Sequence, residues 1–259
     1  MLFRSRLPFK IMLGAYLAAE MNNFGCPWGA TYSEEQLDAN LAENEAEVDR
    51  LIAMADAHPD IVFSVAVGNE ATVEWTDHFV PVHRMLEHVR RVKRAVRQPV
   101  TVCENYVPWQ HALRELASEL DFISLHTYPV WEYKHVHEAL DYTRHNYESV
   151  ARLYPDKPVI ITEAGWATNS NGRGIQPHHT SQDLQDIYVR DLLKWTDEAG
   201  ILCFVFEAFD EPWKGSPDPL EPEKHWGLYT VEREPKKAVQ DWHAGAVAAS
   251  DSPGSKPAA

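Results

Sequence analysis

The stretch that decides the fold is SVAVGNE, residues 64–70, a short apolar run that ends in a glutamate. Such runs of Val and Ala are typical of a strand buried in a parallel sheet. Glu70 then stands at the rim of a core, where a carboxylate costs free energy unless it has a partner or a function. The same pattern recurs in PVIITEAGW, residues 158–166, where an apolar run ends at Glu163.

Both glutamates are expected at the carboxyl ends of strands, which line the active site in a barrel of alternating strands and helices. Paired carboxylates are the groups that cleave glycosidic bonds, one as acid and base and the other as nucleophile. The sequence therefore predicts chemistry on a sugar at Glu70 and Glu163. The alternative for either residue is a structural ion pair at a strand end.

The rest of the chain alternates between strand and helix patterns, which predicts parallel βα units. The predicted strands cover residues 10–17, 61–68, 99–103, 121–125, 158–162 and 201–206. The predicted helices cover residues 33–57, 80–96, 109–119, 136–154 and 181–198. We expect an α/β fold of the (β/α)8 TIM-barrel type that lacks its first two βα units. Residues 1–243 form the predicted catalytic domain, and residues 244–259, rich in Ala, Ser, Gly and Pro, a disordered tail.

Composition limits the classes of partner. The 259 residues are enough for one large domain, and the net charge of −15 disfavours nucleic acid and anionic membranes. The sequence contains no stretch of 18 apolar residues, so no membrane span is expected. Residues 1–17 are interpreted as leading into a strand rather than as a signal peptide. We expect a soluble protein and assign it to no compartment.

Cysteines and histidines do not predict a metal or a cofactor. Cys26, Cys103 and Cys203 have no metal-ligand spacing, and the last two are expected to be buried thiols. The 13 histidines lack the H-E-x-x-H spacing of zinc enzymes. His126, at a predicted strand end, is expected to be a core histidine with satisfied hydrogen bonds rather than a catalyst.

Aromatic residues reach 11% of the chain. Sugar clefts use aromatic faces, whereas aromatic residues also fill cores, and here both interpretations stay open. The tryptophans in question are Trp109, Trp131, Trp166, Trp213 and Trp226.

Four motifs stand at predicted strand ends in a fixed order. They are VGNE at 67–70, HTYP at 126–129, TEAGW at 162–166, and FEAFDEPWK at 206–214 followed by EKHWGL at 223–228. In this order, over residues 10–236, the chain resembles glycoside hydrolase family 17, and its last block resembles the bacterial members. The resemblance implies a retaining enzyme that acts on β-1,3-glucan, as a hydrolase or a transglycosylase.

The resemblance also implies residue roles. Glu70 matches the acid/base and Glu163 the nucleophile. Asn69 matches a residue that bonds the sugar 2-hydroxyl, and Tyr128 matches a hydroxyl beside the nucleophile. The remaining predicted substrate-binding residues are Trp131, Trp166, Glu207, Glu211, Lys214, Glu223 and Trp226. Two alternatives stay open here, a supporting role for Glu207 and a solvated loop position for Lys214.

Two other functions compete with this one. The chain could be a non-catalytic or degenerate glucan-binding barrel, or a retaining glycosidase with another β-glycan substrate, because one barrel hosts many chemistries. The expected partner is a β-glucan oligosaccharide or polysaccharide. An incomplete barrel would leave exposed strand edges, which an oligomer could cover.

Overall fold

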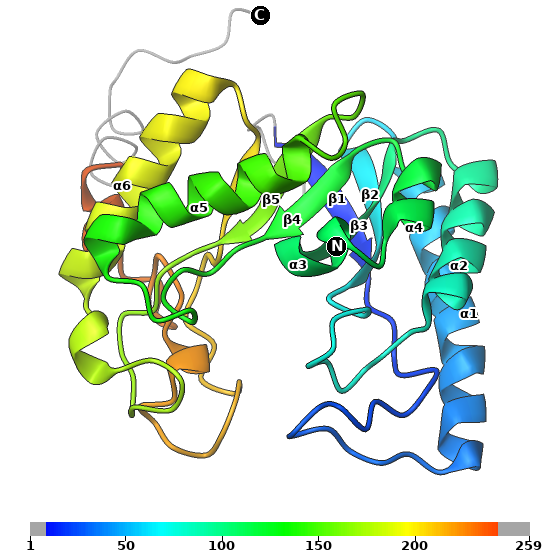
Figure 1. The fold of residues 1–259 in the computed structure, drawn as a ribbon, viewed down its shortest axis with the longest axis horizontal. Helices are drawn as coiled ribbons and strands as arrows, with labels where there is room; N and C mark the ends of the chain where they lie inside the picture. The colour runs from blue at the N-terminus through cyan, green and yellow to red at the C-terminus, as the bar shows by residue number, and fades with distance from the viewer. Residues whose placement is uncertain (1–8, 243–259) are drawn as a thin grey trace, which may run out of the picture. The chain divides into compact units, whose positions relative to one another are not determined.

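The computed structural model describes residues 9–242, and the predicted tail at 244–259 lies outside the described residues. Six strands form one sheet in the order β1-β2-β3-β4-β5-β6, which is also their order along the chain (Figure 1). The strands are β1 (Ile11–Ala15), β2 (Val62–Asn69), β3 (Val100–Asn105), β4 (Ile123–His126), β5 (Val159–Ala164) and β6 (Cys203–Val205). The pairs β1–β2, β2–β3, β3–β4 and β5–β6 are parallel, so the predicted parallel βα units are confirmed.

Helices alternate with these strands as predicted. They are α1 (Glu34–Ala57), α2 (Val82–Ala95), α3 (Tyr106–Gln110), α4 (Arg114–Glu119), α5 (Val136–Ala151) and α6 (Gln182–Ala199), with short 3-10 helices η1 (Pro177–His179), η2 (Pro222–Lys224) and η3 (Lys237–Val239). No helix between residues 9 and 242 combines the length and the apolar character that crossing a membrane requires.

The prediction of one helix over residues 109–119 is wrong, because two short helices stand there. Asn105 begins α3 early by accepting a hydrogen bond from the Val107 amide, an N-terminal cap that the apolar spacing does not reveal. The chain leaves helical geometry at His111, and α4 starts only at Arg114.

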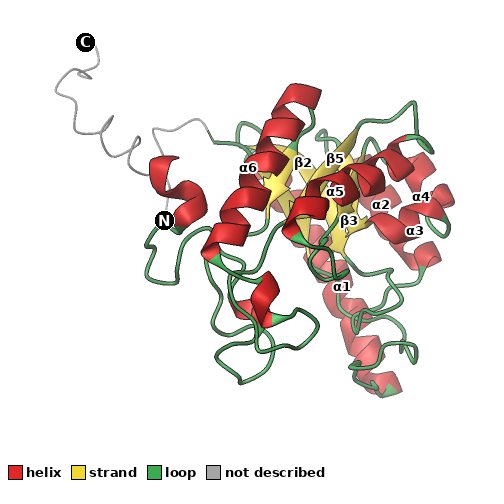
Figure 2. Cartoon of the chain, turned by 60° about the vertical axis from the view of Figure 1, so that its left-hand side comes forward, coloured by secondary structure: helices red, strands yellow, loops and turns green. Residues whose placement is uncertain are grey.

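The chain divides into two compact units. The first contains residues up to His126 together with Asn146–Ile160, and the second contains Thr127–His145 and the residues from Ile161 onward. The first unit therefore holds β1 to β4 with α1 to α4, and the second holds α6 and β6. Figure 2 shows the helices in red and the strands in yellow.

In the first unit, α1 and α2 run beside each other and pack on β1 and β2 (Figure 1). A capping box starts α1, with Ser33 and Gln36 exchanging hydrogen bonds. Close packing explains Gly68, whose φ is +86° and whose added Cβ would lie 2.9 Å from the Met85 Cε atom of α2. A glycine there lets α2 approach the end of β2, two residues before Glu70.

In the second unit, α6 begins at the Ser181 cap and ends at Gly200 in the left-handed conformation, as predicted. The Gln185 side chain on α6 donates hydrogen bonds to the carbonyls of Trp166 and Trp226. Gly165 permits a still closer approach, because a Cβ there would lie 2.1 Å from the Phe206 carbonyl oxygen. These contacts hold together the segments that follow β5 and β6.

The three cysteines are free thiols, and Cys26 and Cys103 are buried. Burial raises the pKa of the Cys203 thiol to about 12, so it stays protonated near neutral pH. The prediction of a buried thiol is confirmed for Cys103, whereas Cys203 is a free thiol of intermediate exposure.

Candidate active site

Glu70 follows β2 at a sharp turn of the backbone. Its φ is +46°, an uncommon value for a residue with a side chain, and its amide donates a hydrogen bond of 2.9 Å to the Cys103 carbonyl of β3. The Glu70 side chain is 28% exposed, and its Oε1 atom lies 2.9 Å from the Nδ1 atom of His126. A partly exposed carboxyl group with a fixed imidazole neighbour can exchange a proton with a bound molecule.

His126 ends β4 and is buried, as expected for a core histidine, but its partner is the Glu70 carboxyl group. The proton of this hydrogen bond can sit on Nδ1 when Glu70 is charged or on Glu70 when Nδ1 is the acceptor. His126 is therefore a site residue that the sequence interpretation set aside. Its position at a strand end, like that of Glu70, was the available signal.

Glu104 is a second residue that the sequence interpretation did not place in the site. It is fully buried near the end of β3, where its Oε2 atom accepts hydrogen bonds from the amide and the hydroxyl of Thr72, and Oε1 accepts from the Asn105 amide. Burial raises its pKa to about 7, opposed by the Thr72 hydrogen bonds and reinforced by the charge of Glu70. Because Thr72 is two residues beyond Glu70, Glu104 anchors the turn that carries Glu70.

Glu163 lies in β5, in the second unit. The Tyr128 hydroxyl donates a hydrogen bond of 2.6 Å to its Oε2 atom, and the Thr127 amide donates to its backbone carbonyl at 3.0 Å. The Tyr128 ring is itself held edge-on against Phe206 and Trp226, with ring centroids 5.8 and 5.0 Å away. A hydrogen bond to a carboxylate favours its charged form, which a nucleophile requires.

Lys214 lies between two carboxylates of the second unit. Its Nζ atom is 2.9 Å from Glu207 and 2.5 Å from Glu211, and it lies 4.6 Å from the centre of the Phe206 ring. Lys214 is therefore held by two carboxylates rather than solvated alone, and its role in binding substrate stays a prediction. Burial raises the pKa of Glu207 to about 7, against the lowering effect of Lys214.

The tryptophans divide by burial. Trp109, Trp166 and Trp226 are fully buried, and the Trp166 indole donates a hydrogen bond to the His179 carbonyl. Burial matches the core alternative for these three, so Trp166 and Trp226, which were predicted to bind substrate, lie in the core, where Trp226 packs against Tyr128 and Trp166 against Tyr188. The physical reason is the packing of Trp226 against Tyr128 and the bonding of Trp166 to the backbone, neither of which local sequence reveals.

Trp131 and Trp213 differ from that group. Trp131 is half-buried, with its ring beside Gly174, where an added Cβ would lie 2.3 Å from the indole. Trp213 is 70% exposed and lines a cavity of about 680 Å³ formed by residues between 210 and 232. Lys224 braces this loop by donating hydrogen bonds to the carbonyls of Pro212 and Lys214.

Asn69 and Glu223 complete the predicted residues. Asn69 is half-buried at the end of β2, and its carbonyl lies 2.9 Å from the His78 Nε2 atom. Glu223 is half-buried in η2, near the turn at Gly215. The first unit thus holds Asn69 and Glu70, whereas the second holds Tyr128, Glu163, Glu207, Glu211, Lys214 and Glu223.

A profile of the BtgE/BtgC glycoside hydrolase domain matches residues 15–227, which is most of the chain and includes Glu70 and Glu163. The chain belongs to this glycoside hydrolase family. The family match agrees with the expectation of a sugar-cleaving fold. It does not by itself distinguish family 17, or a bacterial branch of it, from related groups.

Individual relatives carry names from glucan chemistry. The chain is 24% identical over 208 residues to the glucan 1,3-beta-glucosidase of Arthroderma benhamiae, covering 74% of this chain and 66% of the relative. It is 24% identical over 176 residues to the glucan 1,3-beta-glucosidase of Schizosaccharomyces pombe, covering 63% of this chain and 53% of the relative. The chain thus spans less than two thirds of the length of either relative.

Solved structures share the architecture. An endo-laminarinase from Formosa Hel1_33_131 superimposes with a TM-score of 0.78 at 27% identity, covering 98% of this chain and 74% of that one. A Rhizomucor miehei beta-1,3-glucanosyltransferase, solved as an active-site mutant with laminaritriose, gives a TM-score of 0.62 at 24% identity, with coverages of 74% and 71%. The described part of this chain thus has a fold consistent with part of a TIM-barrel-like glycosidase.

Proposed function

We propose that this chain is a retaining glycoside hydrolase that cleaves β-1,3-glucan with Glu163 as nucleophile and Glu70 as acid/base. The family membership and the names of the relatives support the reaction class and the glucan substrate. The observation that carries the residue roles is that each glutamate stands at the carboxyl end of a parallel strand, Glu70 just after β2 and Glu163 within the last residues of β5, and has its own polar partner. His126 contacts Glu70, and Tyr128 contacts Glu163.

In the first step of this proposal, a carboxylate oxygen of Glu163 forms a bond to the anomeric carbon of the sugar. The bond from that carbon to the glycosidic oxygen breaks, and Glu70 donates its proton to the departing oxygen. A covalent glycosyl-enzyme results, and retaining enzymes carry out this step with carboxyl groups roughly 5–5.5 Å apart.

In the second step, Glu70 acts as a base on a water molecule, whose oxygen attacks the anomeric carbon and releases Glu163. The imidazole of His126 at 2.9 Å gives Glu70 a partner in either protonation state. The hydroxyl of Tyr128 stabilises Glu163 when its negative charge returns. We also assign Asn69 to the sugar 2-hydroxyl, because it matches the residue that bonds this group in the family it resembles.

The stereochemistry of the first product tests this mechanism. We expect proton NMR of laminarihexaose hydrolysis to show the β-anomer forming first, with the α-anomer appearing only by mutarotation. An α-anomer as first product would overturn double displacement.

Two variants test the residue roles. Glu163→Gln should lower kcat by at least about a thousandfold on every substrate, since the nucleophile is lost. Glu70→Gln should lower activity on laminarihexaose strongly but far less on an aryl glycoside, because a stable phenolate leaves without protonation. Full activity of Glu163→Gln would refute its assigned role.

Transfer to a second sugar is the finer alternative within the same chemistry. If an acceptor hydroxyl rather than water captures the glycosyl-enzyme, laminarihexaose yields chains longer than itself. The fold shared with the glucanosyltransferase supports this alternative, and products longer than six glucose units would assign transglycosylation.

We also propose that the chain belongs to the bacterial branch of glycoside hydrolase family 17, because of the motifs around Glu70, Tyr128 and Glu163.

A further inference from the structure

Tyr16 is an exposed aromatic residue near Glu70, and it has no role in the mechanism described so far. Tyr16 directly follows β1, whose last residue Ala15 pairs with Val67 of β2, so Tyr16 continues beside the β2 segment that leads to Glu70. Side chains alternate at this strand end, since Ala15 and Leu17 are buried whereas Tyr16 is 60% exposed. A large aromatic face is therefore presented to solvent at the strand edge that carries Glu70.

The Tyr16 ring is held in place by His78. The two ring centroids are 4.8 Å apart, and the Tyr16 hydroxyl lies 3.1 Å from the His78 Nδ1 atom. His78 Nε2 lies 2.9 Å from the Asn69 carbonyl, which only accepts, so Nε2 carries the proton. The His78 Nδ1 atom also lies 2.9 Å from the Thr76 hydroxyl and 3.1 Å from the Asp77 carboxylate, so Tyr16, Thr76 and Asp77 together hold this edge of the ring.

This chain of contacts links Tyr16 through His78 to the backbone of Asn69, the residue before Glu70. Further contacts stiffen the two loops involved. Asn23, from the loop after β1, donates hydrogen bonds to the carbonyls of Glu74 and Thr76 in the loop after β2. The position of the Tyr16 ring relative to Glu70 is thus set before any ligand binds, which lowers the entropy cost of binding.

We propose that Tyr16, supported by His78, is a platform that binds a glucopyranose unit of the substrate beside Glu70. The flat ring would take the C–H face of a neutral hexopyranose, which is apolar, while the hydroxyl groups around the sugar's edge stay in water. Placement next to the acid/base puts this sugar beside the bond to be cleaved. The inference rests on the proposed function, because it assumes that Glu70 protonates that bond.

Binding and turnover are measured separately to test the platform. In a Glu163→Gln background, calorimetry with laminarihexaose gives Kd without hydrolysis, and in the wild-type background kcat and KM are measured. Tyr16→Ala should raise Kd and KM about tenfold, corresponding to a lost stacking contact. Tyr16→Phe keeps the ring and should raise them less than about threefold.

Two further variants control for folding. Tyr16→Leu keeps apolar bulk without a flat ring, so it should behave like Tyr16→Ala. Met54→Ala removes a half-exposed side chain near the end of α1, away from the carboxyl end of β2, and should leave Kd unchanged. Thermal unfolding of each variant confirms that the fold is retained.

The outcomes separate the platform from the proposed function. If the wild-type protein cleaves laminarihexaose but Tyr16→Ala and Tyr16→Leu bind it normally, the platform is refuted and the function stands. If the protein binds laminarihexaose through Tyr16 without cleaving it, the function is refuted and the platform stands. Absence of any laminarihexaose binding refutes both.

Discussion

At the scale of single residues, the surroundings of a buried carboxyl group decide its pKa. Glu104 has three hydrogen-bond donors and no basic side chain among its hydrogen-bond partners, so burial dominates and its pKa rises to about 7. Glu163 instead accepts a hydrogen bond from the phenolic hydroxyl of Tyr128. Environment thus sets apart glutamates that look alike in sequence.

Glu104→Gln should change how stability depends on pH. The folded-state pKa of Glu104 is raised from 4.5 to about 7, so the folded protein binds more protons than the unfolded chain between these values. Wild-type stability therefore falls as pH rises from about 4.5 to about 7, whereas the variant lacks this titration. The free energy of unfolding of Glu104→Gln, relative to wild type, should rise across that window by up to about 3 kcal/mol.

Urea unfolding at a series of pH values measures this difference. The Asn105 hydrogen bond lost in Glu104→Gln adds an offset that does not vary with pH, so the slope is the diagnostic quantity. Glu115→Gln, at an exposed position of α4, is the matched control. Parallel stability curves for wild type and Glu104→Gln would contradict the assignment.

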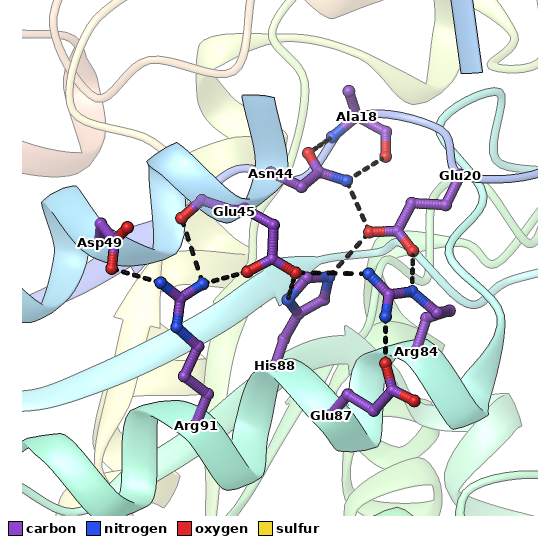
Figure 3. Close-up of polar contacts among 9 residues, drawn as sticks. All are labelled: Ala18, Glu20, Asn44, Glu45, Asp49, Arg84, Glu87, His88 and Arg91. Atoms are coloured by element: carbon purple, nitrogen blue, oxygen red, sulfur yellow. Dashed lines mark hydrogen bonds and ion pairs between the residues drawn. The ribbon is translucent and has the colours of Figure 1, made fainter. Parts of the chain in front are cut away.

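At the scale of elements, a buried carboxylate fastens the loop after β1 to two helices (Figure 3). Glu20 accepts hydrogen bonds from Asn44 of α1 at 3.0 Å and from Arg84 of α2 at 2.7 Å, and it lies 2.7 Å from the His88 Nε2 atom. Asn44 also exchanges two hydrogen bonds with the backbone of Ala18. This loop carries Tyr16 at its start, so its anchoring bears on the proposed platform.

Glu20→Gln should destabilise the protein and flatten its acid response. Burial raises the pKa of Glu20, but hydrogen bonds from His88, Asn44 and Arg84 outweigh burial and lower it from 4.5 to about 2. The stabilisation is therefore present above pH 4.5 and is lost as pH falls toward 2. At pH 7 we expect the variant to lose about 2–3 kcal/mol, since a buried charge pair is broken.

Unfolding by urea at pH 7 and at a series of pH values from about 4.5 down to about 2.5 checks this expectation. Glu87→Gln removes another carboxylate partner of Arg84, but one that is more than half exposed, so its effect should stay within about 0.5 kcal/mol. Equal stability of Glu20→Gln and wild type at pH 7 would show that the anchor contributes nothing.

The ends of strands and helices show which boundaries a local sequence pattern can predict. The strand ends at Glu70 and Glu163 follow from apolar runs, and the start of α1 follows from Ser33 and Gln36, because these signals lie within a few residues. The split of the predicted helix at 109–119 escaped detection, because the Asn105 cap acts before the apolar pattern begins. Six strands in chain order could be predicted, whereas the length of each could not.

At the scale of the whole molecule, strand order equals chain order, as expected when each βα unit is added beside the previous one. The proposed catalytic groups draw on separate supports. His126 and Glu104 serve Glu70 in the first compact unit, and Tyr128 serves Glu163 in the second. The net charge of −15 favours a neutral substrate over an anionic one.

Salt should therefore distinguish neutral from anionic glucans. We expect KM for laminarin to stay constant between about 10 and about 200 mM salt, whereas KM for a carboxymethylated β-1,3-glucan should fall as screening weakens repulsion. Initial rates at fixed pH measure both, with the same chain length in each glucan as the control. A KM for the anionic glucan that is insensitive to salt would contradict electrostatic exclusion.

By itself, the sequence determined the alternation of strands and helices and the strand-end positions of Glu70 and Glu163, because each depends on residues adjacent along the chain. Only the tertiary structure decided that His126 contacts Glu70, that Glu104 anchors Thr72, and that Trp166 and Trp226 are buried. These contacts join residues tens of positions apart, from separate strands and loops. Local apolar patterns carry no information on which distant side chain fills a given space, so packing alone settles it.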